Sequence, residues 1–138
     1  MLYLADTSIW VGSRRNGAQK LSETLAERLE ADEIAICMPI ALEVLTGPET
    51  GDEVDDDWNT VWRHLHWLPT GDEVMERAFD LLLTLAHAAP GAHRREPLDY
   101  IVAASAEAAG NDVILWHSKP DLAAICSLAG IAQETFAG

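Results

Sequence analysis

The sequence predicts an α/β fold in which a parallel sheet carries helices on both faces. Short apolar runs alternate with longer segments of helical periodicity, as strands joined by crossover helices do. Proline and glycine stand at the boundaries between these segments. The 138 residues contain no repeat, linker or low-complexity tract, so we expect one domain spanning residues 1–138.

Five apolar runs predict the strands. The first run follows Met1 directly, and the second and fourth are rich in isoleucine and valine, which favour extended backbone. The third and fifth runs are only two residues long. The predicted strands are residues 2–5, 34–37, 67–68, 113–116 and 131–132.

Helices are predicted where apolar residues recur at helical spacing or where a capping residue opens a segment. Leu21, Leu25 and Leu29 recur at intervals of four with charges between them, which is typical of an amphipathic helix. Pro39 and Pro97 fit the first turn of a helix. The predicted helices are a short one after Asp6 and residues 20–30, 39–46, 58–65, 73–87, 97–109 and 121–128, with an acidic loop over 49–57.

The charge balance limits the partners that the protein can bind. The formal net charge is −14, from 9 Lys and Arg against 23 Asp and Glu, so the surface repels nucleic acid at long range and favours basic partners. A nucleic-acid substrate stays open, because a divalent cation in a site changes the local field. Arg14 and Arg15, and the basic stretch 93–95, could help locally.

The cysteines and the hydropathy pattern predict a cytoplasmic protein that does not enter membranes. Cys37 and Cys126 lie in apolar runs without chelating spacing, which favours two reduced thiols in the core. No stretch approaches the roughly 20 apolar residues of a membrane span. The chain reaches Asp6 too early for a signal peptide.

Two acidic residues follow predicted strands. Asp6 comes directly after the first strand and Asp121 shortly after the fourth, and the carboxyl ends of parallel strands meet at one edge of a sheet. Each could instead simply cap the helix that follows it. Their common edge nevertheless indicates a binding site.

Two further acidic residues lie in apolar helical segments. Glu43 is surrounded by apolar neighbours over 40–45, where a carboxylate needs a cation or an arginine unless it faces solvent. Asp99 lies in the first turn of the helix that Pro97 opens, where the helix dipole alone would favour it. Together with Asp6 and Asp121 they predict a site for Mg²⁺ or Mn²⁺, which prefer oxygen ligands. Zinc-ligand spacing and phosphate-binding glycine motifs are absent from the sequence.

The whole chain resembles the PIN-domain ribonucleases, and specifically the VapC toxins of type II toxin–antitoxin modules. The first three matching segments agree with that family in residue type, order and spacing. The resemblance rests on residues 4–10 (LADTSIW), 42–47 (LEVLTG), 98–104 (LDYIVAA) and 114–122 (ILWHSKPDL).

The resemblance implies an α/β/α sandwich and an acidic pocket that binds Mg²⁺ or Mn²⁺. Asp6, Glu43 and Asp99 carry over as catalytic acids and metal ligands. The fourth segment departs from the family, because Lys119 stands where the fourth acid usually lies. Either Asp121 completes the pocket as a fourth metal ligand, or the site has only three acids. The implied partners are an RNA substrate, a cognate antitoxin and a second copy in a homodimer.

Three functions remain open from the sequence. The first is a metal-dependent endoribonuclease toxin that hydrolyses structured RNA and is inhibited by an antitoxin. The second is a PIN-like module without catalysis that binds RNA or protein, which Lys119 supports. The third is a metal-dependent nuclease that acts on DNA or processes RNA without an antitoxin.

Overall fold

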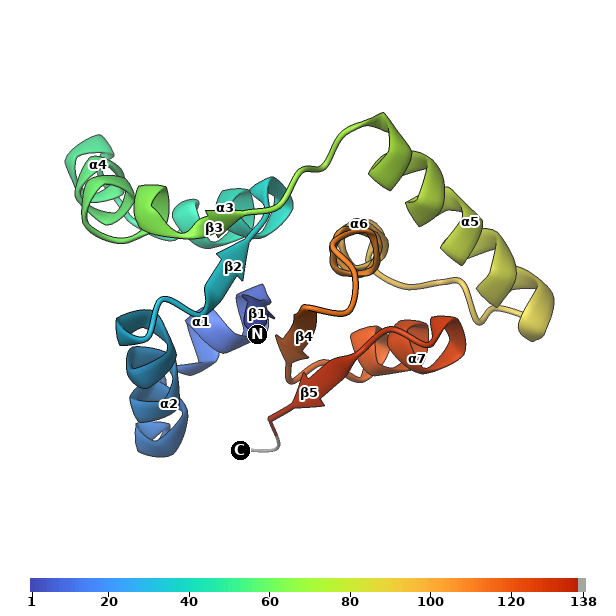
Figure 1. The fold of residues 1–138 in the computed structure, drawn as a ribbon, viewed down its shortest axis with the longest axis horizontal. Coiled ribbons are helices and arrows are strands. Elements are labelled where there is room, and N and C mark those ends of the chain that lie inside the picture. Colours follow the sequence, from blue (N-terminus) through green and yellow to red (C-terminus); the bar gives the residue numbers. More distant parts are fainter. Residues whose placement is uncertain (137–138) are drawn as a thin grey trace.

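The computed structural model describes residues 1–136 and contains a five-stranded parallel sheet flanked by helices (Figure 1). The strands lie in the order β3-β2-β1-β4-β5, and every neighbouring pair is parallel. The predicted α/β/α sandwich is therefore confirmed. The strands are β1 (Leu2–Ala5), β2 (Ile34–Ile36), β3 (His66–Trp67), β4 (Val113–His117) and β5 (Gln133–Thr135).

The helices form two groups around the sheet. Figure 1 shows α5, α6 and α7 together on the side of β4 and β5, whereas α2, α3 and α4 lie toward β2 and β3. A 3₁₀ turn, η1 (Trp62–His64), precedes β3. The α-helices are α1 (Thr7–Gly12), α2 (Gln19–Glu30), α3 (Met38–Leu45), α4 (Gly51–Thr60), α5 (Asp72–Ala88), α6 (Pro97–Ala108) and α7 (Pro120–Ala129).

The strand order creates a switch point between β1 and β4. The chain runs outward from β1 through β2 to β3, then returns through α5 and α6 to β4 on the other side of β1. Ligands of open parallel sheets bind beside the carboxyl ends of the strands at such a point. Asp6 follows β1 directly, and Ser118 and Lys119 follow β4, so the fold brings these residues to the same edge.

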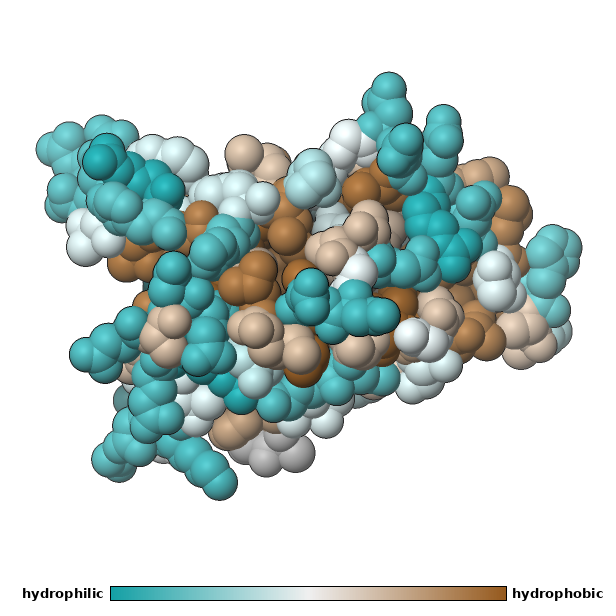
Figure 2. All heavy atoms as spheres, in the orientation of Figure 1, coloured by the Kyte–Doolittle hydropathy of each residue, from teal (hydrophilic) through white to brown (hydrophobic). Residues whose placement is uncertain are grey.

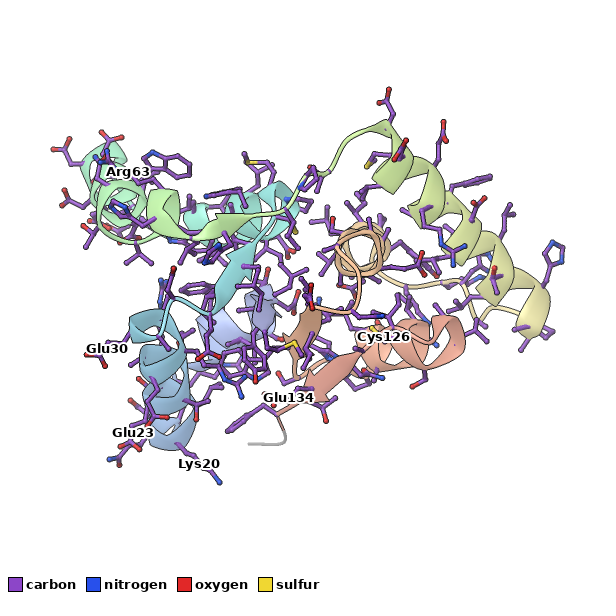
Figure 3. The ribbon with its side chains drawn as sticks, in the orientation of Figure 1. Lys20, Glu23, Glu30, Arg63, Cys126 and Glu134 are labelled. Carbon is purple, nitrogen blue, oxygen red and sulfur yellow. The ribbon has the colours of Figure 1, made fainter. Side chains whose placement is uncertain are left out.

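The central strands and the helices packed on them form the core. Leu4, Ile36 and Leu115 on three adjacent strands are fully buried, and each such side chain contributes roughly 1.5–3 kcal/mol by leaving water. The two cysteines are buried free thiols, as predicted; Figure 3 shows Cys126 on α7 within the molecule. Burial raises the pKa of the Cys37 thiol to about 11 and that of Cys126 to about 12.

The acidic segment predicted as a loop is largely helical, which corrects the prediction over residues 49–57. The Thr50 hydroxyl accepts a hydrogen bond from the Glu53 amide at 3.2 Å, and the Glu53 carboxylate accepts one from the Glu49 amide at 3.3 Å. The Thr50 cap, a return bond from Glu53 to the residue before the cap, and the acids in the first turn stabilise the start of this helix. No residue of α4 is buried, and its surface is mostly hydrophilic (Figure 2), so no apolar stripe in the sequence indicated it.

Other boundaries differ from the predictions by a few residues. The helix expected over 58–65 divides into the end of α4 and the turn η1, and β3 starts one residue earlier than expected. The last strand begins at Gln133 rather than Ile131, because the Ile131 amide donates to the Cys126 carbonyl at 2.9 Å and so completes the end of α7. Within residues 1–136, no helix is long and apolar enough to cross a membrane.

Candidate metal centre

Asp6 is held at the end of β1 by two backbone contacts. Its amide donates to the Trp116 carbonyl on β4 at 3.0 Å, and its Oδ2 accepts from the Ser8 amide at 3.0 Å, which makes Asp6 the N-cap of α1. The residue is 1% exposed, and its Oδ1 is buried without a hydrogen-bond partner in the described part of the chain. The capping role therefore uses one carboxylate oxygen and leaves the other without a partner.

Asp99 presents a second buried carboxylate from α6. Pro97 opens that helix, so Asp99 lies in its first turn, and it is 1% exposed. Oδ1 accepts a hydrogen bond from the Lys119 ammonium at 3.0 Å, whereas Oδ2 is buried and has no partner among residues 1–136. Burial raises the pKa of Asp99, the hydrogen bond and charge of Lys119 oppose this, and the negative charge of Asp6 adds to it.

Glu43 reaches the same region from α3. It is half-buried, and its Oε1 accepts a hydrogen bond from the Thr7 hydroxyl at 3.2 Å. Thr7 is the first residue of α1 and adjoins Asp6, so this bond orients the Glu43 carboxylate relative to the end of β1. The hydroxyl of Thr7, which follows Asp6 in the chain, thus contacts the carboxylate of Glu43.

Lys119 supplies a positive charge to these acids. Its amide donates to the His117 Nδ1 at 3.1 Å, and its side chain is 31% exposed. Burial lowers the pKa of Lys119, but the hydrogen bond and charge of Asp99, with the charges of Asp6 and Glu43, outweigh burial and raise it. Lys119 is therefore charged at neutral pH, and the negative charges of Asp6, Glu43 and Asp99 all stabilise its ammonium.

Asp121 has a different partner. Its Oδ1 lies 2.5 Å from the Arg95 guanidinium, and its side chain is 48% exposed. Arg95 also donates to the Ala92 carbonyl, so this ion pair ties the segment before α6 to the start of α7. The role of Asp121 as a fourth metal ligand stays a prediction.

The residues present meet part of what a divalent cation requires. Two buried carboxylate oxygens without partners, Asp6 Oδ1 and Asp99 Oδ2, fit a hard cation, because a buried charge needs a compensating partner. Among residues 1–136, however, no three His, Cys, Asp or Glu side chains are grouped closely enough to hold an ion. Carboxylate oxygens are therefore suitable ligands for such an ion, but Lys119, rather than a further acidic ligand, lies beside Asp99.

Two residues at this edge, His117 and Arg95, were not predicted as site residues from the sequence. His117 is fully buried at the end of β4; its Nδ1 accepts from the Lys119 amide, so its Nε2 carries the proton and donates to Gln133 Oε1 at 2.9 Å. Arg95 belongs to the basic stretch 93–95, but its ion pair with Asp121 forms only in the folded chain. An apolar strand that ends in histidine is the one signal that could have indicated His117.

A cavity of about 480 Å³ lies beside the acids, between α1, α2 and the end of β4. Ser8 connects it to the acidic residues, because the Ser8 amide contacts Asp6 while its hydroxyl accepts from the Ser118 amide at 3.0 Å. Its rim is basic, although the whole chain carries −14. Lining residues include Ser8, Arg15, Asn16, Lys20, Ser118 and Phe136.

Comparison with known proteins defines the class of this fold and site. The PIN domain family model matches residues 3–119, and the chain therefore belongs to the PIN domain family. Within that family it is similar to Ribonuclease VapC18 of Mycobacterium tuberculosis, at 29% identity over 138 residues, covering 97% of this chain and 94% of the relative. The resemblance to VapC proteins read from the sequence is thereby confirmed.

Solved structures of VapBC complexes share the fold. DNA-bound VapBC from Salmonella typhimurium matches with a TM-score of 0.72 at 16% identity, covering 98% of each chain. VapBC2 from Rickettsia felis, bound to a fragment of its promoter DNA, matches with a TM-score of 0.73 at 14% identity, covering 99% of this chain and 100% of the other. VapBC-1 from nontypeable Haemophilus influenzae matches with a TM-score of 0.72 at 14% identity, covering 98% of each chain.

Proposed function

We propose that the protein is a metal-dependent endoribonuclease toxin of VapC type that hydrolyses phosphodiester bonds in structured RNA. The observation that carries the proposal is the pair of buried aspartates at the switch point, each with one oxygen lacking a partner among the described residues. Membership of the PIN domain family and similarity to a protein named as a ribonuclease support it.

The roles of the acids follow from their positions. Asp6 and Asp99 would hold Mg²⁺ or Mn²⁺ through their free oxygens, and Glu43, oriented by Thr7, would complete the set. Such an ion lowers the pKa of a coordinated water and stabilises negative charge on a phosphate. Asp99 or Asp6 would accept the proton of the attacking water as general base. Attack by water leaves a 5′-phosphate and a 3′-hydroxyl.

The cavity beside Asp6 supports a nucleic-acid strand as the substrate. A strand whose scissile phosphate lay at the acids would continue past Ser8 and Ser118 toward Arg15 and Lys20. Cationic side chains bind the phosphate backbone without reading its sequence. The chain would thus offset its overall negative charge at the one place where a phosphate must approach.

One observation favours a second function. The ammonium of Lys119 already pairs with Asp99, so the acidic residues could persist as a structural cluster in a PIN-like protein that binds RNA or protein without cleaving it. In that case neither Mn²⁺ nor Mg²⁺ would be needed for binding. The two functions are separated by catalysis and by metal requirement.

Cleavage of purified bacterial total RNA in the presence of Mn²⁺ tests the proposal. We expect discrete fragments with 5′-phosphate ends, no cleavage in EDTA, and no cleavage by Asp6→Asn. A 2′,3′-cyclic phosphate end would contradict hydrolysis by water. Intact RNA with every metal, together with RNA binding that persists in Asp6→Ala and Glu43→Ala, would support the second function instead.

The double variant Arg15→Ala/Lys20→Ala tests the strand path. Arg63→Ala is the control, because Arg63 lies beside α4, far from Lys20 (Figure 3). We expect the double variant to raise KM with little change in kcat, and to reduce the salt dependence of RNA binding by about two phosphate contacts. An unchanged KM and salt slope would exclude this path.

The antitoxin and the homodimer are also proposals. A surface of net charge −14 suits a basic partner segment, and the family resemblance implies such an inhibitor. Co-purification with the product of the adjacent reading frame, together with loss of RNA cleavage in the complex, is the expected result. Light scattering of the purified protein alone should give the mass of a dimer; a monomer at micromolar concentration would contradict the homodimer.

A further inference from the structure

We propose that the Lys119 side chain is a built-in cation of the acidic centre, and that a divalent metal ion binds only when this side chain moves away from Asp99. The inference rests on the proposed metal site and adds how this particular chain regulates it. It starts from the 3.0 Å contact between Lys119 Nζ and Asp99 Oδ1.

The Lys119 ammonium is the hydrogen-bond donor and the counter-ion of Asp99 Oδ1. The Asp99 side chain is 2% exposed, and Lys119 is its only ion-pair partner in residues 1–136. Asp6 and Glu43 act on the same ammonium through their charges. The Lys119 ammonium therefore occupies one oxygen of Asp99, a carboxylate that a divalent ion at the proposed site would use, and the charges of Asp6 and Glu43 also favour it there.

The two cations exclude each other for electrostatic reasons. A divalent ion that used the Asp99 carboxylate would lie a few ångströms from the ammonium, at a depth where water screens their repulsion poorly. A buried carboxylate left without either cation is also unfavourable. The carboxylate is therefore expected to exchange one cation for the other rather than to hold both.

The Lys119 side chain has space beside it into which it can move. Its backbone is fixed by the hydrogen bond to His117 Nδ1 and by the start of α7, whereas its side chain already reaches solvent. A second hollow of about 240 Å³ adjoins it, and Ser118, Lys119, Pro120, Ala123, Thr135 and Phe136 line this hollow. The flexible four-carbon stem can turn into it without any change in the fold.

Mn²⁺ titration calorimetry without RNA tests the exchange. We expect Lys119→Met to bind Mn²⁺ at least tenfold more tightly than the natural protein. Lys119→Arg, which keeps the charge, should bind about as weakly as the natural protein. Arg63→Met removes a positive charge beside α4, outside the proposed site and strand path, and should change the affinity less than twofold (Figure 3). Equal or weaker Mn²⁺ binding by Lys119→Met would overturn the inference.

A second measurement holds even if Lys119→Met fails to fold. In the natural protein labelled with ¹⁵N at lysine side chains, saturating Mg²⁺ should shift the Lys119 Nζ resonance and remove its protection from hydrogen exchange. A resonance that stays unchanged while Mg²⁺ binds would overturn the exchange. Neither experiment uses RNA, so a protein that passes both and cleaves no RNA refutes the proposed function alone.

Discussion

Asp6 has two roles that a pair of substitutions can separate. Its Oδ2 caps α1 through the Ser8 amide, and its Oδ1 is available to a cation. Asn caps a helix about as well as Asp, whereas Ala cannot cap it. We therefore expect metal-free Asp6→Asn to keep the stability of the natural protein, and Asp6→Ala to lose about 1 kcal/mol of unfolding free energy.

These energies translate into melting temperatures. For a domain of this size, 1 kcal/mol corresponds to roughly 4 °C, so Asp6→Ala should melt about 4 °C below Asp6→Asn without metal. Mn²⁺ at a hundred times its Kd stabilises a protein by about 2.7 kcal/mol, which is roughly 10 °C. We expect that increase in the natural protein and its absence in both variants, measured by calorimetry or circular dichroism.

Two outcomes would refute this reasoning. If Mn²⁺ raises the melting temperature of Asp6→Asn as much as that of the natural protein, Asp6 is a cap and not a ligand. If the two variants melt together without metal, the hydrogen bond to Ser8 contributes nothing to stability. The comparison therefore tests the functional interpretation of Asp6 against the purely structural one.

Further predictions concern the fourth acid and the cysteines. Asp121→Asn should weaken Mn²⁺ binding less than threefold in calorimetry, because Arg95 already uses this carboxylate; a loss as large as that of Asp6→Asn would make Asp121 a ligand. With pKa values of about 11 and 12, Cys37 and Cys126 are at most ~0.1% thiolate at pH 8. Iodoacetamide should label them only after unfolding, and increasingly as pH rises; rapid labelling of the folded protein would contradict their burial.

The sequence predicted the parts of the fold that depend on buried apolar runs. The strands β1, β2 and β4 and the helix α6 are such runs, and their positions agree with the expectations to within one or two residues. Helix α4 was missed because it buries nothing and depends on the Thr50 cap and first-turn acids. Strand β5 is polar and lies at the sheet edge, where pairing with β4 rather than hydrophobicity defines it.

The sequence singled out candidate site residues, whose roles as metal ligands stay predictions, but it could not predict their contacts. Asp6, Glu43 and Asp99 stood out because each adjoins apolar sequence, and in the fold the charges of all three raise the pKa of Lys119. The pairing of Lys119 with Asp99 depends on the end of β4 lying beside the start of α6, which no local pattern encodes. The diversion of Asp121 to Arg95 has the same origin, since those residues lie 26 positions apart.

Anomalous diffraction from crystals soaked in Mn²⁺ would locate the metal ion and the lysine in one experiment. We expect an ion in contact with carboxylate oxygens of Asp6 and Asp99, with the Lys119 ammonium displaced from Asp99. An ion bound elsewhere, or no ion at all while the bond between Lys119 and Asp99 persists, would contradict this expectation.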